Sequence, residues 1–182
     1  MQELSLNILD IAQNSIVADA TLIEIGVSVD ENELLTITVK DNGKGMDAEA
    51  VKNVVNPFFT SRTTRKVGLG VPFFKQAAEE TGGSFRIESQ PGVGTTIEAV
   101  FDTNNIDCTP LGAVWETVAI LIQMNEHLDF VYTVKKDGNE FVCDTRQLKE
   151  IMEGMPLSDL AVVQWIKEFI RENQTEILKR SY

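Results

Sequence analysis

The sequence predicts an α+β fold in which an antiparallel or mixed sheet carries its helices on one face, followed by a smaller α+β extension. Two observations predict this class. Stretches with apolar residues at helical spacing are interspersed with stretches in which every second residue is apolar. In the first 102 residues they come in the order helix, two strands, helix, loop, helix, two strands, which is typical of hairpins covered by a helical layer.

Each element has its own signal. Residues 3–18 place Leu4, Ile8 and Ile11 at helical spacing, and residues 21–29 alternate through Ile25 and Val27 as a half-buried strand does. The other elements expected in this part are a strand at 34–39, helices at 48–55 and 68–80, and strands at 84–89 and 95–101.

The remaining residues, 103–182, are expected to form an extension that serves as a partner or dimer surface and follows a first unit at 1–102. Its expected elements are a linker at 102–110, a helix at 111–123, a hairpin with strands 130–134 and 140–143, a helix at 147–153 and a final helix. Ser158 is the expected N-cap of that last helix, with Leu160, Ile166 and Ile170 facing inward. The pattern fits both an appended domain and an extension packed directly on the first unit.

Composition excludes several classes of function. The 182 residues include 28 acidic and 16 basic side chains, a formal net charge of −12, which argues against a general nucleic-acid binder. Two cysteines are too few for a disulfide framework or a zinc site. No signal peptide opens the chain and no apolar run approaches a membrane span, so we expect a cytoplasmic protein without a membrane partner.

A local exception to this acidity lies between Ala50 and Ala78, where no Asp or Glu occurs. Arg62, Arg65 and Lys66 stand in this stretch, just before Gly68-Leu69-Gly70 at an expected helix start. Cations and free amides at a helix N-terminus favour an anionic ligand, so the segment predicts a phosphate-binding loop. It is not the dinucleotide fingerprint, because Phe73 stands at the third glycine position.

Asp10 and Asn14 lie four residues apart and share one face of the first helix. A carboxylate and an amide suit a hydrated magnesium ion, and Asp10 could instead act as a base. A solvated polar edge of the helix is the alternative for this pair.

Asp41-x-Gly43-x-Gly45 ends a strand. A carboxylate there can accept a hydrogen bond from the amine of adenine, and glycines let a flat base approach the backbone. The alternative is that these residues form an ordinary Asp-Asn-Gly turn.

Taken together, these motifs resemble the ATP-binding domain of the superfamily of gyrase, ATP-driven chaperones, histidine kinases and mismatch-repair ATPases (GHKL), whose fold is the Bergerat-type α/β sandwich. The resemblance covers residues 1 to about 102, and its Pro-Phe-Phe-Thr loop before Gly-Leu-Gly is most similar to that of sensor histidine kinases. It rests on Asp10-x-x-x-Asn14, Asp41-Asn42-Gly43-Lys44-Gly45-Met46, Pro57-Phe58-Phe59-Thr60, Gly68-Leu69-Gly70 and Gly92-Val93-Gly94-Thr95-Thr96.

The resemblance implies a role for each position. Asn14 would hold magnesium, Asp41 would accept the adenine amine, and Asp10 stands where hydrolytic members and protein-serine kinases use a glutamate base. Phe58 and Phe59 would anchor a lid. The full set expected to bind ATP is Asn14, Asp41, Gly43, Gly45, Met46, Phe58, Phe59, Thr60, Arg62, Arg65, Lys66, Gly68, Leu69, Gly70 and Thr95 or Thr96, with Asp10 as catalytic group and second magnesium ligand.

No histidine precedes the first helix, so we do not expect a complete, self-phosphorylating sensor kinase. Two functions fit. The first is transfer of the γ-phosphate of Mg-ATP to another, regulatory protein, as in histidine kinases or anti-sigma serine kinases. The second is an ATP-dependent switch that binds a partner, with little hydrolysis or transfer. A homodimer through the extension is compatible with both.

Overall fold

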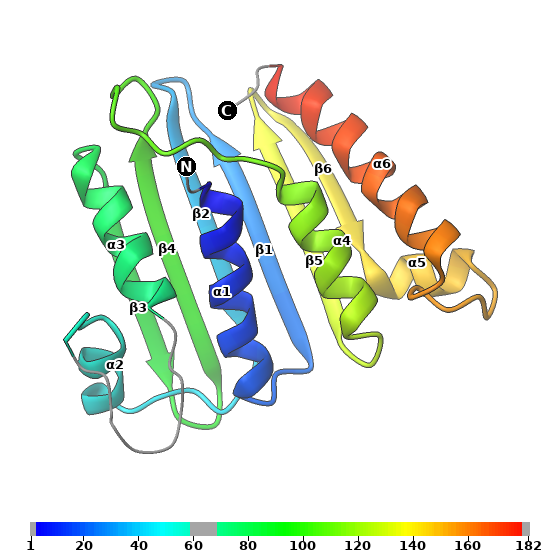
Figure 1. The fold of residues 1–182 in the computed structure, drawn as a ribbon, viewed down its shortest axis with the longest axis horizontal. Helices are drawn as coiled ribbons and strands as arrows, with labels where there is room; N and C mark the ends of the chain where they lie inside the picture. The colour runs from blue at the N-terminus through cyan, green and yellow to red at the C-terminus, as the bar shows by residue number, and fades with distance from the viewer. Residues whose placement is uncertain (1–2, 59–68, 180–182) are drawn as a thin grey trace.

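A six-stranded mixed sheet runs through the chain in the order β3-β4-β2-β1-β5-β6. The computed structural model describes residues 3–58 and 69–179. The strands are β1 Leu22–Val29, β2 Leu34–Asp41, β3 Ser84–Gln90, β4 Gly94–Asp102, β5 Asp129–Lys136 and β6 Asn139–Asp144. The helices are α1 Leu4–Val17, α2 Ala48–Val54, α3 Gly70–Glu80, α4 Val114–Met124, α5 Thr145–Ile151 and α6 Leu160–Leu178. This architecture confirms the predicted α+β class (Figure 1).

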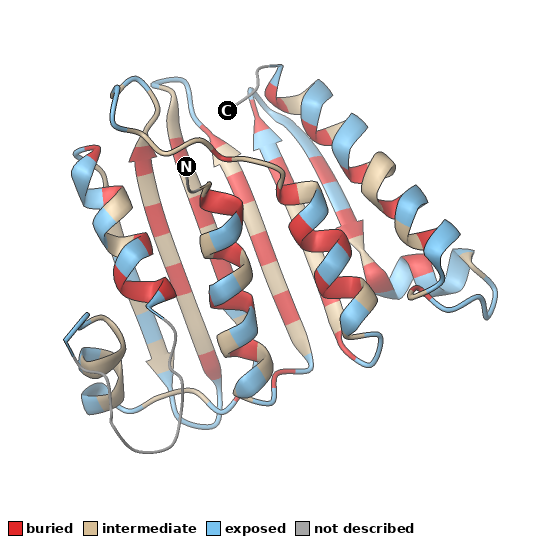
Figure 2. Ribbon diagram, in the orientation of Figure 1, coloured by how far each residue is buried: buried red, intermediate tan, exposed pale blue. Residues whose placement is uncertain are grey.

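The strands bury one face. In β1, Ile23, Ile25, Val27 and Val29 are buried, and the residues between them are half-buried on the opposite face. Because successive strand residues point to opposite sides of a sheet, this alternation gives the sheet one apolar face. Helices α1, α3, α4 and α6 cover it, and the buried positions of the helices lie against the sheet (Figure 2).

The extension continues the same sheet. Strand β5 pairs in parallel with β1 along its whole length, from Leu22 opposite Asp129 to Val29 opposite Lys136. Helix α4 packs against α1, and α6 packs against α4, β5 and β6. Residues 103–179 therefore share a sheet and a core with the described residues before them, which is the second of the two arrangements that the sequence left open.

The helix expected from residue 111 begins at Val114. Gly112 has a φ of +75°, a left-handed conformation that suits glycine, and it interrupts the apolar run. Glu3 lies directly against Gly112, and its carboxylate accepts a hydrogen bond from the Ala113 amide at 3.3 Å. The turn therefore ties the crossover connection to the start of α1.

The N-cap of α6 is Asp159, one residue later than the expected Ser158. The Asp159 carboxylate accepts from the amides of Ala161 and Val162, at 2.9 and 3.3 Å, whereas the Ser158 amide donates to Glu126. Leu160, which the pattern placed inward, is 78% exposed, while Ile166 and Ile170 are buried as expected. Within residues 3–58 and 69–179, no helix has the length and apolarity that crossing a membrane requires.

Candidate functional site

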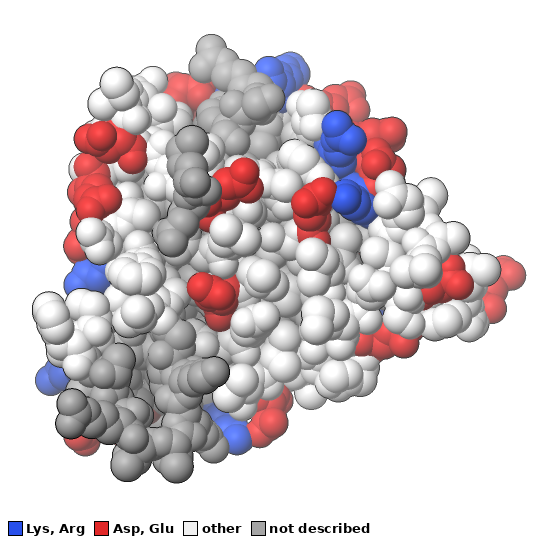
Figure 3. All heavy atoms as spheres, in the orientation of Figure 1, with Lys and Arg blue, Asp and Glu red and all other residues white. Residues whose placement is uncertain are grey.

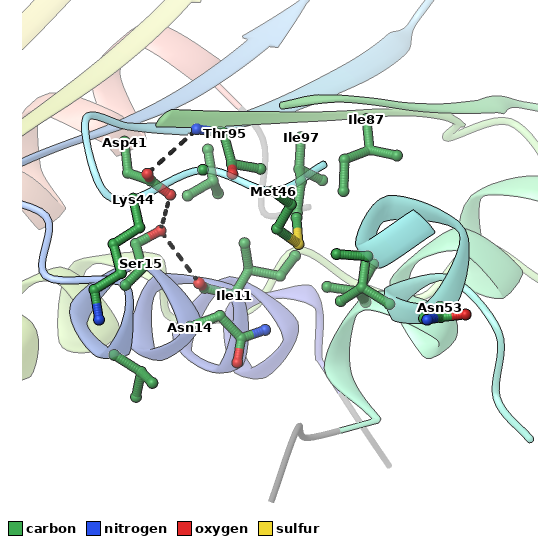
Figure 4. A pocket seen from close by; sticks show the side chains of 17 residues that line it. Ile11, Asn14, Ser15, Asp41, Lys44, Met46, Asn53, Ile87, Thr95 and Ile97 are labelled. Carbon is green, nitrogen blue, oxygen red and sulfur yellow. Dashed lines mark hydrogen bonds between the residues drawn. The ribbon is translucent and has the colours of Figure 1, made fainter. Parts of the chain in front are cut away.

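A cavity of about 430 Å³ opens between the helical layer and one end of the sheet (Figure 4). Helices α1 and α2 and strands β2, β3 and β4 contribute to its wall, together with the loop after β2 and the start of α3. Its lining residues are Ile11, Asn14, Ser15, Val17, Ala18, Val39, Asp41, Lys44, Gly45, Met46, Ala50, Asn53, Val54, Val71, Ile87, Thr95 and Ile97. The wall is mainly apolar with a few polar groups, which is the usual character of a small-molecule site.

Asp41 is the most strongly held polar group in this wall. Ser15 Oγ donates to Asp41 Oδ2 at 2.6 Å, and the Gly43 and Thr95 amides donate to Asp41 Oδ1 at 2.8 and 3.3 Å (Figure 4). These donors come from α1, the loop after β2 and β4. Because three donors from three segments hold it, the carboxylate keeps one orientation and is preorganised to accept a ligand N–H.

The glycines of the Asp-x-Gly-x-Gly segment lie where backbones meet. A Cβ placed on Gly43 would lie 2.7 Å from the Ala18 carbonyl oxygen, and one on Gly45 would overlap the Gln90 carbonyl. Gly45 also has a φ of +69°. Gly45 lines the cavity, while Gly43 is buried behind Asp41. Both glycines therefore have steric reasons to be there that an ordinary turn does not require.

The two threonines that sequence reasoning could not separate are on opposite faces of β4. Thr95 lines the cavity, and its hydroxyl lies 2.7 Å from Ser89 Oγ, which also accepts from the Met46 amide at 2.8 Å. Thr96 lines a different hollow, on the other side of the sheet, beside Glu24 and Lys40. Strand alternation separates them, so Thr95 is the one placed beside Asp41.

The predicted pair on α1 divides in the same way. Asn14 lines the cavity, whereas Asp10 is exposed one turn away and lies against Gly70 at the start of α3. A Cβ on Gly70 would approach the Cβ of Asp10 to 2.6 Å, so only glycine fits this close approach. Partial burial raises the pKa of the Asp10 carboxyl above its usual value. A carboxylate with a raised pKa is a better proton acceptor, and this one faces a helix N-terminus.

The structure describes only part of the predicted lid and phosphate loop. Phe58 is 91% exposed, and its role as an anchor stays a prediction. Leu69 precedes α3 and is 41% exposed, and Gly70 is buried. The other residues predicted for the lid and phosphate loop lie outside the described residues, namely Phe59, Thr60, Arg62, Arg65, Lys66 and Gly68.

Sequence reasoning missed two hydroxyl groups that organise the site, Ser15 and Ser89. Ser15 had a signal, since it lies four residues after Ile11 on the inward face of α1, where a polar side chain needs a partner. Ser89 also had one, since the strands expected at 84–89 and 95–101 place it directly opposite Thr95 across a hairpin. The apolar wall could have been read from period-two alternation, because Val39 and Ile97 are two residues from Asp41 and Thr95.

The donors present fit a magnesium ion that arrives with a nucleotide. Throughout residues 3–58 and 69–179, no three His, Cys, Asp or Glu side chains come together as a metal site. Asn14 nevertheless offers an amide oxygen to the cavity, and Mg²⁺ commonly takes one or two protein oxygens and completes its shell with phosphate oxygens and water. Asn14 would hold such an ion, with Asp10 one helical turn away.

Comparisons with known proteins agree with this geometry. Residues 1–105 match the family of histidine kinase-, DNA gyrase B-, and HSP90-like ATPases. A putative sensor protein of Shewanella frigidimarina is 31% identical over 102 residues, 56% of this chain, and sporulation kinase C of Bacillus subtilis is 36% identical over 64 residues, 35% of this chain. The chain spans only 15% of the length of either relative.

The fold also matches a solved structure, the N-terminal domain of a DNA repair protein. The TM-score is 0.56 at 13% identity, over 78% of this chain and 52% of the other. At this identity the likeness concerns the fold alone. The family match covers more than half of the chain, from α1 to the end of β4. It includes every strand and helix that lines the cavity and none of α4–α6. The chain therefore belongs to the histidine kinase-, DNA gyrase B-, and HSP90-like ATPase family.

Proposed function

We propose that this chain binds Mg-ATP in the cavity and transfers its γ-phosphoryl group to a residue of another, regulatory protein in the cytoplasm. The observation that carries the transfer step is the position of Asp10, an exposed carboxylate with a raised pKa against the first residue of α3. In this proposal Asp41 accepts the adenine amine at the closed end, and the triphosphate extends past Asn14 toward Gly70.

The chemistry assigned to the chain is simple. Asp10 takes the proton of an acceptor hydroxyl or orients an acceptor nitrogen as the bond to the γ-phosphorus forms, and the bond from phosphorus to the bridging oxygen breaks to leave ADP. The amides at the start of α3 face the phosphate charge, and their partial positive charge stabilises it. Mg²⁺, when bound with ATP, supplies further neutralisation of that charge.

The relatives support a signalling context. Two of them are named as a sensor protein and a sporulation kinase, and they are 31% and 36% identical to this chain over 102 and 64 residues. Phosphotransfer is therefore the first candidate function that we propose for this chain.

The second candidate is a nucleotide-dependent switch. It is favoured by the position of Asp10 outside the cavity lining, because an aspartate is one methylene shorter than the glutamate base of related enzymes and has less reach. It is also favoured by the continuous sheet, through which a change at β2 and α1 reaches β5 and α4 directly.

The test uses γ-labelled ATP and the soluble proteins of the source cell. Label on a protein other than the chain, lost in Asp10→Ala and retained in Gln13→Ala, is the result expected of a kinase. Gln13 is a matched control, since it is exposed on α1 and does not line the cavity. Tight ATP binding without transfer or hydrolysis in the unaltered chain would reject the kinase and support the nucleotide-dependent switch.

A further inference from the structure

The last strand of the sheet has an open edge. Strand β6 lies at the end of the strand order and pairs only with β5. A two-residue turn at 137–138 joins β5 to β6, so Lys136 and Asn139 pair on either side of it. Hydrogen bonding to β5 then alternates along β6, and the backbone groups of Glu140 and Val142 point away from β5. Over the part of the chain that the structure describes, no strand pairs with that side of β6.

An aromatic row on α6 stands beside this edge. The Phe141 ring of β6 meets the Phe169 ring edge-on, with centroids 5.3 Å apart, and Trp165 stacks on Phe169 at 4.9 Å. Phe141 is buried, but Trp165 is 44% exposed. The apolar surface of Trp165 is therefore left open next to unpaired backbone groups, an arrangement that natural sheets usually avoid.

Two acids continue the row along the same side of α6. Glu172 and Glu176 lie three and seven residues after Phe169, so helical spacing places them on its side, and both are exposed. Neither forms an ion pair with any residue in the described ranges. We call Trp165, Phe169, Glu172 and Glu176 the α6 ledge. It is apolar toward the start of α6 and acidic toward its end.

The opposite edge of the sheet is protected in a way that β6 is not. At β3, the Met46 amide donates to Ser89 Oγ at 2.8 Å, and the Gly92 amide in the turn after this strand donates to the Lys44 carbonyl at 2.6 Å. Helix α2 also packs on β3. At β6, the contacting elements are β5, α5 and α6, and α6 lies above the sheet and runs opposite to β6 (Figure 1). The two edges of the sheet therefore differ: α2 and the loop after β2 contact β3, whereas the outer side of β6 has no such neighbour among the described residues.

We propose that the β6 edge and the α6 ledge bind an extended, basic segment of a partner protein, which adds a seventh strand to the sheet. Backbone groups of Glu140 and Val142 would pair with the segment, an apolar side chain would cover Trp165, and basic side chains would meet Glu172 and Glu176. Charge decides the occupant. The chain carries a net charge of −12, and the two glutamates of the ledge are exposed among the mixed charges that Figure 3 shows in this region, so a basic strand is attracted and a second copy is repelled.

The proposed direction follows from the ledge. A strand antiparallel to β6 runs in the same direction as α6, so it meets Trp165 first and the two glutamates afterwards. The probe is a synthetic peptide of about seven residues, Val-Thr-Val-Thr-Lys-Thr-Lys, slightly longer than the six residues of β6. Its odd positions share one face and present valines to the aromatic row and lysines to the acids. The reversed sequence and a version with Glu in place of Lys are the comparison peptides.

Binding is measured by fluorescence of Trp165 in a Trp115→Phe background and by amide exchange of the full chain. We expect saturable binding of the first peptide, weakening with salt, with slowed exchange at Glu140 and Val142. Trp165→Glu should weaken binding about 30-fold or more, as loss of a buried aromatic anchor does. The double variant Glu172→Lys with Glu176→Lys should weaken it about tenfold, whereas Glu79→Lys with Glu80→Lys, an equal charge change on α3, should leave it unchanged.

Other outcomes overturn the proposal. Equal binding of the Glu-containing peptide, no effect of either ledge variant, or protection away from residues 139–144 would each reject it. The double lysine variant alters only exposed side chains, so it keeps the test valid if Trp165→Glu does not fold. A dimer of the unaltered chain that Trp165→Glu converts to a monomer would show that a second copy occupies the edge instead.

Discussion

Ser15 on α1 donates to Asp41 at the end of β2 across 2.6 Å, and this hydrogen bond joins the helical layer to the sheet inside the cavity. Ser15 is 3% exposed, so its hydroxyl is withdrawn from water, and Asp41 is its closer acceptor, since the Ile11 carbonyl oxygen lies at 3.5 Å. The hydrogen bond explains how a carboxylate 26 residues after Ser15 in the sequence comes to belong to the same site as the residues of α1, and it identifies Ser15 as a positioning residue.

The first prediction concerns this pair. Asp41→Asn should weaken ATP binding at least about 30-fold, because a charged acceptor held by three donors is replaced by an amide that must turn an N–H toward some of them. Ser15→Ala should weaken binding about five- to tenfold, since it removes one hydrogen bond and leaves two. Calorimetric titration with ATP measures both.

The matched control for these variants is Asp47→Asn. Asp47 caps α2 through the Ala50 amide and does not line the cavity, and asparagine caps helices about as well as aspartate. It should bind ATP normally. Normal ATP binding by Asp41→Asn would show that the cavity is not the nucleotide site.

The second prediction concerns the contact between α1 and α3. In Gly70→Ala, the new Cβ would lie 2.6 Å from the Cβ of Asp10, so the start of α3 must move away from α1. We expect the loss to depend on the phosphates: ATP affinity should fall by about tenfold or more while adenosine affinity stays close to normal. Gly26→Ala is the control, because its Cβ would meet Thr38 at an ordinary 3.8 Å. Equal losses for ATP and adenosine would place Gly70 outside the phosphate region.

The third prediction follows from the pKa of Asp10, which burial raises. A carboxyl whose pKa is higher in the folded than in the unfolded chain opposes folding when it is charged, so stability is lost as pH rises from the ordinary Asp value through the raised one. Asp10→Asn should therefore raise the melting temperature at pH 7 and lose this advantage as pH falls toward 4. Phosphotransfer should be lost in the same variant, and Asp10→Glu, which restores the charge, should regain part of it.

The melting temperature and the phosphotransfer activity of these variants together separate a functional carboxylate from a structural one. A residue that only supports the fold would lower the melting temperature when replaced, whereas a group kept for its chemistry is replaced at a gain in stability. A lower melting temperature of Asp10→Asn at pH 7 contradicts the assignment.

Local patterns in the sequence predicted most of the helices and strands. Asp41, Asn14 and Gly45, which the motifs singled out, line the cavity, because motifs at the ends of regular elements depend on a few neighbouring residues, and their binding of a nucleotide stays a prediction. Pairings between distant elements were beyond reach. Nothing in the alternation of residues 129–136 states that their neighbour is β1 and not another strand, since period-two patterning determines faces and not partners.

The cap of α6 shows the limit at a smaller scale. Ser158 and Asp159 are both good N-cap residues, and sequence preference does not separate them. The choice depends on Glu126, more than 30 positions earlier, which accepts from the Ser158 amide at 3.2 Å and leaves the cap to Asp159.

The last prediction tests whether the extension and the ATP domain form one cooperative unit. Tyr132 on β5 donates to Gln174 on α6 at 2.7 Å, and both side chains are buried. Tyr132→Phe leaves the Gln174 amide oxygen without this donor and should lower the free energy of unfolding by about 1–3 kcal/mol. Adding Gln174→Leu removes the buried amide that has lost its donor and should recover part of that loss.

Because β5 pairs with β1 along its whole length, the destabilisation caused by Tyr132→Phe should reach the strands of the cavity. Urea unfolding followed by the fluorescence of both tryptophans of the extension, and amide exchange in β2, should therefore shift together. An unchanged exchange rate in β2, alongside earlier unfolding of the tryptophan signal, would show instead that residues 103–182 unfold as a separate domain.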